Sequence, residues 1–375
     1  MKRVNNMKFS PIRFQAALAA AGVALMPFVY LQFSVPHGNG IIGFSDISGS
    51  VAAGSYLIMF LVGIMAAFTA AHFVLTTVYL KDLFLWISDK KEFDDFLGNP
   101  LTNTGIFSPI ISLAMSINVV LGPVVFFFEF SGDVVQSMLL PVFMIWGILW
   151  ALLLLAEARV LKLWFVKPVE TEKLNFGWLL DVFAFGMVSL VGAGIAVLSV
   201  KSHIASSSAL MTIVALAAGA FIFAAKLVIL IYHQLRAEKL PEKSSLPGYF
   251  TVVPILCLFG VSVYKFNIYL KNKFAYDLGA FSFFAVVISF AAAVLCIFLI
   301  TYLLEEYFRE EFGKKEFYPS LWSPVCALVG FEVLGCYVYG NYYRSPALLF
   351  VCFLSTVMAV VLYASNFLKY RRYAK

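Results

Sequence analysis

The chain has 375 residues, of which 62% are apolar and 13% are charged. A soluble globular domain carries about 25% charged residues, so this composition excludes an ordinary water-soluble protein and favours one surrounded by lipid. The net charge of +6 is small, and no run of Lys and Arg is long enough to follow a phosphate backbone, so we expect no nucleic-acid partner.

Ten stretches along the chain are long and apolar enough to cross a membrane, which takes about 20 mostly apolar residues each. The first stretch is too long for the apolar part of a signal peptide and lacks a cleavage site, so we predict that it is retained. The predicted spans are roughly Pro11–Phe33, Val51–Leu80, Thr104–Phe128, Val134–Ala156, Phe176–Ser199, Ala209–Tyr232, Leu246–Phe266, Asp277–Leu303, Pro319–Tyr339 and Pro346–Leu368. Short linkers join them, so we expect an all-α polytopic membrane protein with a single transmembrane domain over residues 1–375.

The basic residues of the loops predict the orientation of the chain. Of the 27 Lys and Arg residues, 21 lie in the two tails and in the loops after the second, fourth, sixth and eighth spans. Five lie on the opposite side, Lys265 among them, and Lys226 lies inside the sixth span. Because cytoplasmic loops carry the excess of basic residues, both termini are predicted to lie in the cytoplasm, which requires an even number of spans.

A repeated pattern divides the spans into helical hairpins. The fifth, seventh and ninth spans start 72 residues apart. Similar junctions lie at or just before these starts, at Lys173–Trp178, Ser245–Phe250 and Phe317–Trp322. Repeats of this kind commonly build transport proteins, with the solute path on the symmetry axis. The predicted unit is therefore a two-helix hairpin that is used five times.

The odd-numbered spans are richer in interior Pro and in clustered small residues than the even-numbered spans. An interior proline frees a carbonyl group and bends the helix, which lipid tolerates only where protein or water satisfies the freed group. We therefore expect the odd spans to form an inner ring around a pore, with helix kinks at Pro27, Pro109, Pro123, Pro254 and Pro324. The residues expected to line the pore are Ser116, Ser189, Gly192, Gly194, Gly260, Ser262 and Cys326. The alternative is that small residues only permit close helix packing.

Several segments of the chain resemble the tellurite-resistance/dicarboxylate transporter family, which includes bacterial TehA-like proteins, sulfite exporters and the plant slow anion channels. These segments are Ala218–Ala220 through His233–Leu235, Phe250–Leu256, Asn99–Pro100 leading into Phe107–Ser112, and Leu321–Leu328. The resemblance implies five hairpins in a quasi-fivefold arrangement around a central pore and a small anion as solute, such as chloride, nitrate, malate or sulfite. It also implies the bacterial inner membrane as location, with a homotrimer among the expected assemblies.

In that family a phenylalanine on the ninth helix commonly occludes the pore. Matching the Leu321–Trp322 segment places Cys326 at that position, and a thiol is smaller than a phenyl ring. Phe331 lies five residues further along and points in a different direction. Three explanations stay open: a different register, closure of the path by another ring, or a different mode of gating.

Ionisable side chains inside the spans are few, and each needs a reason because a charge in mid-span costs about 2.5–3.5 kcal/mol. Glu332 is a candidate for proton coupling, and the simpler interpretation is a carboxylic acid bonded to a neighbouring helix. Lys226 is expected to extend to the cytoplasmic interface. His72 is expected to be a neutral imidazole bonded between helices.

At the cytoplasmic ends of the fourth and fifth spans, Asp181, Glu157 and Arg159 are expected to supply an ion pair at the interface. That pair would be structural.

The favoured function is therefore membrane transport of a small anion by a channel or passive carrier. We find no nucleotide-binding or catalytic motif, so we expect no enzyme activity. The five cysteines form no C-x-x-C pair, which argues against a metal site, and no cofactor is expected. The alternatives are a proton-coupled exporter of a weak acid or sulfur oxyanion, a structural subunit, and an electron-transfer subunit. The last fits poorly, because only one histidine lies inside a span and a b-type haem usually has two axial ligands.

Overall fold

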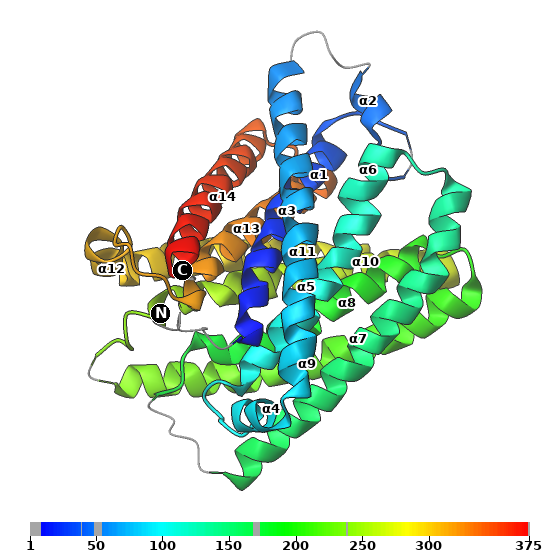
Figure 1. Cartoon of the computed structure of the whole chain (residues 1–375). Helices are drawn as coiled ribbons and strands as arrows, with labels where there is room; N and C mark the ends of the chain where they lie inside the picture. Colours follow the sequence, from blue (N-terminus) through cyan, green and yellow to red (C-terminus); the bar gives the residue numbers. More distant parts are fainter. Residues whose placement is uncertain (1–8, 39, 49–54, 168–172, 238, 374–375) are drawn as a thin grey trace, which may run out of the picture.

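The computed structural model describes residues 9–38, 40–48, 55–167, 173–237 and 239–373 (Figure 1). Ten of its helical segments are long and apolar enough to span a membrane, and no strand occurs in the described residues. The predicted all-α membrane fold is thus confirmed. The predicted start of the second span at Val51 and the basic residues before Phe9 lie outside the described ranges.

The spans alternate between an inner and an outer group. The inner spans are α1 (Phe14–Ser34), α5 (Phe107–Val119), α8 (Leu180–Leu198), α10 (Val252–Phe274) and α13 (Ser323–Asn341), and a π-helical turn (Val120–Val124) and α6 (Val125–Phe128) extend α5. The outer spans are α3 (Ser55–Ser88), α7 (Gly132–Val166), α9 (Ser202–Arg236), α11 (Gly279–Leu303) and α14 (Pro346–Tyr373). Three short helices, α2 (Phe44–Ser48), α4 (Lys90–Leu97) and α12 (Glu305–Glu310), lie in the connections.

Burial separates the two groups. In the most apolar stretch of each span, 67% to 89% of the residues are buried in the inner group and 17% to 33% in the outer group. Outer helices expose large apolar side chains, such as Phe84, Phe221 and Phe298, which suit a lipid surface better than water. The division into inner odd spans and outer even spans matches the pattern of Pro and small residues in the sequence.

The inner helices close into a ring. Each contacts two others, in the order α1, α5, α8, α10, α13 and back to α1. Each inner helix also packs against the outer span that follows it in the chain, as expected for a hairpin unit. The quasi-fivefold symmetry of this ring stays a prediction.

Every inner span begins with a short 3-10 turn. These turns cover Pro11–Arg13, Asn103–Ile106, Phe176–Leu179, Leu246–Thr251 and Pro319–Trp322. Consecutive turns contact one another, and the last contacts α1, so all five lie at one end of the bundle. The rings of Phe176 and Tyr249, from two adjacent turns, stack with their centroids 4.2 Å apart. We call this the basic end, because the Lys- and Arg-rich connections are there, and the other the mouth end.

Three of the five prolines predicted as helix kinks lie at the start of an α-helix. Pro109, Pro254 and Pro324 all lie in the first turn of an α-helix, directly after a 3-10 turn. At this position a proline is tolerated, because its missing N–H would have no partner within the helix. Pro27 lies in the interior of α1, and Pro123 lies in the π-helical turn, so of the five predicted kink prolines only these two lie between the ends of a span.

Candidate functional site

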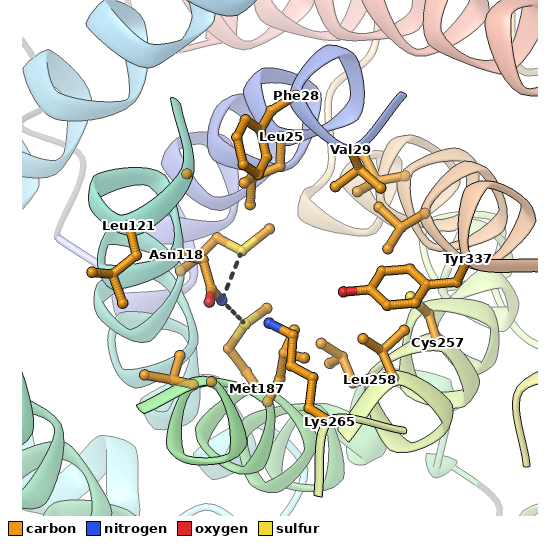
Figure 2. A pocket seen from close by; sticks show the side chains of 18 of the residues that line it. Leu25, Phe28, Val29, Asn118, Leu121, Met187, Cys257, Leu258, Lys265 and Tyr337 are labelled. Carbon is orange, nitrogen blue, oxygen red and sulfur yellow. Dashed lines mark hydrogen bonds between the residues drawn. The ribbon is translucent and has the colours of Figure 1, made fainter. Parts of the chain in front are cut away.

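A cavity of about 320 Å³ lies inside the ring of inner helices (Figure 2). Its described lining residues come from all five inner spans and from Gly40 and Ile41, which follow α1. None of them comes from an outer helix. The cavity extends to the mouth end, where Gly40 is exposed.

The loop at the mouth is held by one side chain of α1. The Gln32 amide nitrogen donates to the carbonyl oxygen of Gly40 at 3.0 Å, and its amide oxygen accepts from the Ile42 N–H at 2.9 Å. Gly40 has φ of +124°, a conformation that favours glycine because it has no Cβ. This pair of hydrogen bonds fixes the segment that borders the opening.

The cavity wall is mainly apolar, with a few polar groups from different helices. Lys265 of α10 is the only charged residue among the described lining residues, and no Asp or Glu is among them. Figure 2 shows the Lys265 amine and the Tyr337 hydroxyl directed into the cavity from two neighbouring inner helices, α10 and α13. The Tyr264 hydroxyl, in contrast, donates to Asn341 Oδ1 at 2.7 Å.

The cavity volume decreases toward the basic end. A second cavity of about 10 Å³ lies there, beside residues of the first turns of the inner spans. Four residues border both cavities, namely Leu18, Phe183, Pro254 and Cys326. These four residues, which we call the constriction, separate the two cavities and come from four of the five inner helices.

The small cavity is more polar for its size than the large one. The amide oxygen of Gln15, which borders this cavity, is buried and has no hydrogen-bond partner among the described residues. The hydroxyl oxygens of Thr251 and Ser323 lie 3.1 Å apart on its wall. The side of the constriction that faces the basic end therefore offers amide and hydroxyl groups.

The model of the voltage-dependent anion channel family (SLAC1) matches residues 8–370 of the chain. The chain belongs to this family. None of the curated proteins matches it. Membership in the voltage-dependent anion channel family supports anion transport as the function and a lipid bilayer as the environment. The resemblance seen in the sequence is thereby confirmed.

Within this anion-channel fold, two of the residues predicted to line the pore border the large cavity. They are Gly194 and Cys326. The carbon that a side chain would add at Gly194 would lie 3.6 Å from Lys265 Nζ. Gly194 of α8 therefore lies next to the ammonium group of Lys265.

The other predicted pore residues lie outside the described lining of both cavities. A Cβ at Gly192 would lie 2.3 Å from the Trp146 ring of α7 and from Thr212 Oγ1 of α9, so this glycine faces the outer helices. A Cβ at Gly260 would lie 2.9 Å from Ser289 of α11. At these two glycines the structure favours close helix packing, the alternative explanation of small residues.

The three predicted serines bond within the protein. Ser189 donates to the carbonyl oxygen of Phe185 at 2.7 Å, and Ser262 to that of Leu258 at 2.6 Å. Such bonds to the preceding turn satisfy a hydroxyl without a solute. Ser116 Oγ lies 2.8 Å from Nε2 of His72.

His72 joins three helices, as expected from the sequence. Its Nδ1 lies 2.8 Å from the carbonyl oxygen of Ala17 on α1, while its Nε2 faces Ser116 on α5. Both ring nitrogens are thus occupied, and the ring is fully buried. The residue is a link between α3 and the inner ring.

Glu332 of α13 is fully buried but does not border either cavity within the described lining. Its Oε1 accepts from the Cys336 thiol at 3.2 Å, and its Oε2 has no partner among the described residues. The Cys352 thiol of α14 lies near its backbone carbonyl, at 3.8 Å. The proton-coupling role of Glu332 stays a prediction.

Lys226 does not extend to the interface, contrary to expectation. Its ammonium group is buried, pairs with the carboxylate of Asp181 on α8 and donates to the Trp178 carbonyl oxygen at 2.7 Å. The same ammonium group lies 4.0 Å from the ring centroid of Trp164 and 4.5 Å from that of Trp178. A buried partner and two aromatic faces replace the water that an extended side chain would reach.

The expected partner of Asp181 was also wrong. Arg159 pairs with Asp94 of α4 instead, at 2.8 Å, on an exposed surface. Glu157 is buried, and neither carboxylate oxygen has a partner among the described residues. The sequence could not separate these pairs, because all the groups lie at the same end of the bundle.

Sequence reasoning missed Lys265 and Phe183. Lys265 was grouped with the loop residues, although it lies well inside α10, whereas Lys271 and Lys273 lie in its last turn. The predicted span ends at Phe266, next to Lys265, and only the longer helix of the structure places this lysine inside the span. For Phe183 there was no signal, because phenylalanine is common throughout these spans.

Proposed function

We propose that the protein lets a small anion cross the membrane passively along the axis of the inner ring, with the constriction closing the path. The observation that carries this proposal is the pair of cavities on either side of Leu18, Phe183, Pro254 and Cys326. The ring of inner helices surrounds both cavities, and the apolar outer helices separate them from lipid.

The chemistry of the wall supports an anion as the solute. A carboxylate on the path would repel an anion, and none borders the cavities within the described lining, whereas one lysine does. The remaining contacts are hydroxyl and amide groups in an apolar wall. Weak contacts of this kind suit flux, because a solute must leave as easily as it enters.

The constriction supports one of the three explanations for Cys326. Phe183 of α8 borders the same layer as Cys326, so a phenyl ring from a different helix is available where the ninth span has only a thiol. We infer that the path is closed by another ring, contributed by α8, and that Leu18 and Pro254 complete the seal.

The test is flux through purified full-length protein in liposomes, with chloride, nitrate, malate and sulfite as separate solutes. A channel is expected to give currents that reverse at the equilibrium potential of the anion, while a carrier gives slow saturating uptake. The proposal fails if neither the wild type nor a variant with an opened constriction passes any of these anions. A cation current of equal size would also contradict it.

The proton-coupled alternative makes a different prediction for the same liposomes. Uptake would then depend on a pH gradient, and Glu332→Gln would abolish that dependence. Because Glu332 does not border either cavity within the described lining, we expect flux to continue without a pH gradient and to survive this substitution.

The cytoplasmic position of both termini, the inner-membrane location and the homotrimer are further proposals. They rest on the 21 basic residues that the sequence assigns to one side and on the family resemblance. Protease access to a C-terminal tag in membrane vesicles tests the orientation, and the mass of the detergent-solubilised particle tests the trimer.

A further inference from the structure

The ammonium group of Lys265 borders the large cavity and has no anionic partner among the described residues. No salt bridge or hydrogen bond joins the Lys265 ammonium group to another described residue, whereas Lys271 on the same helix pairs with Asp277 at 2.8 Å. An ammonium group that leaves bulk water needs a counter-charge or good hydrogen bonds. In the described lining of this cavity no Asp or Glu can supply that charge.

Other polar groups border the same space with unused capacity. The Tyr337 hydroxyl points into the cavity (Figure 2), and no hydrogen bond to it occurs among the described residues. Among the described residues, the Asn118 amide nitrogen donates only to thioether sulfurs, Met115 Sδ at 3.9 Å and Met187 Sδ at 3.6 Å. Sulfur is a weak acceptor, so this amide can turn to a better one.

The geometry points to a monovalent-anion site in the large cavity, formed by the Lys265 ammonium group with the Tyr337 hydroxyl and the Asn118 amide as hydrogen-bond donors. Gly194 of α8 lies beside the ammonium group, because a Cβ there would be 3.6 Å from Lys265 Nζ. The inference rests on the proposed function, because the site lies on the proposed path.

The environment selects among anions by charge and hydration. One lysine balances one negative charge, so sulfate or a dicarboxylate would bring an uncompensated second charge into a mainly apolar cavity. The cost of removing an ion from water rises with its charge, and the three proposed groups replace only part of its hydration shell. The site therefore favours a weakly hydrated monovalent anion, with nitrate as the probe, over sulfate and malate.

The first arm of the test measures permeability ratios in liposomes. Lys265→Gln is expected to lower the nitrate permeability roughly tenfold and to reduce the preference for nitrate over sulfate, because one charge-assisted contact is lost. Lys265→Arg keeps the charge and is expected to keep the preference. Tyr337→Phe removes one donor and is expected to give a smaller change.

Lys271→Gln is the matched control, because it removes the same charge from the same helix outside the cavity. It is expected to leave the ratios unchanged. The inference is overturned if Lys265→Gln conducts with wild-type ratios, or if Lys271→Gln changes them equally. Either result leaves the proposed anion path intact.

The second arm measures binding without flux. Nitrate at constant ionic strength is expected to raise the melting temperature of wild-type protein and of Lys271→Gln in detergent, but not that of folded, monodisperse Lys265→Gln. Lysine-dependent stabilisation without any flux would uphold the site and contradict the transport proposal. Equal responses in all three proteins would overturn the site.

Discussion

Lys226 of α9 forms a buried ion pair with Asp181, the second residue of α8. The two side chains are 3% and 0% exposed, so water does not screen their charges. The pair joins an outer helix to the start of an inner helix, only two residues before Phe183 of the constriction. A substitution that breaks this ion pair is therefore expected to lower the stability of the bundle and to shift the position of Phe183.

We expect Lys226→Met to destabilise the protein by about 3–5 kcal/mol, because it leaves the Asp181 carboxylate buried without its cation. The double variant Lys226→Met/Asp181→Asn should be more stable than Lys226→Met alone, since the second change removes the uncompensated charge. Thermal unfolding in detergent measures both. Arg159→Ala, which breaks the exposed pair with Asp94, should cost only about 0–1 kcal/mol. Similar losses for the two pairs would contradict the assignment.

Phe183→Ala is expected to open the constriction. Each ~1.4 kcal/mol removed from a barrier raises a rate about tenfold, so even a modest loss of the seal should raise anion flux in liposomes about tenfold. The matched control is Phe185→Ala on the same helix. Phe185 is buried but borders neither cavity within their described lining. If both variants raise flux equally, loosened packing and not the constriction is responsible.

Cys326→Phe should have the opposite effect. A phenyl group added beside Phe183 and Pro254 fills the narrowest layer, so we expect lower flux, with about 1–3 kcal/mol of destabilisation from overpacking. Cys296→Phe on the outer helix α11 adds the same ring away from the cavities and should leave flux unchanged. An unaltered flux in folded Cys326→Phe would remove Cys326 from the path.

Gly330→Ala probes the contact between α13 and α10. The added Cβ would lie 2.9 Å from the Cα of Pro254, and a backbone atom cannot move aside alone. We expect about 1–3 kcal/mol of destabilisation, seen as a lower melting temperature. Gly63→Ala on the exposed face of α3 meets nothing within 4 Å and should be neutral or slightly stabilising. If Gly330→Ala and Gly63→Ala have equal melting temperatures, α13 and α10 can move apart to accept the added Cβ.

At the basic end, the Lys243 and Lys314 ammonium groups beside Glu311 hold the pKa of its carboxyl below the usual value of 4.5. A depressed pKa stabilises the fold above the unfolded value, and that stability is lost as the pH falls through the lower, folded pKa. Wild-type protein should therefore lose its stability advantage over Glu311→Gln below about pH 4.5. Melting temperatures of both proteins from pH 7 to pH 3 measure this, and a constant difference would contradict it.

The sequence by itself determined the number of spans, their hairpin order and the division into inner and outer helices. These features depend on properties that each segment carries alone, namely apolar length and the frequency of Pro and small residues. The junctions before Phe176, Gly248 and Ser320 likewise predicted a repeated start, which the structure shows as 3-10 turns in contact.

Only the tertiary structure decided which side chains meet. Gly194 and Gly192 are two residues apart in one helix, yet the first borders the cavity and the second faces Trp146. Helical periodicity gives the relative direction of residues but not the rotation of the whole helix against its neighbours, which packing sets. For the same reason, the partner of Lys226 and the exposure of Lys265 to the cavity depended on how five helices close into a ring.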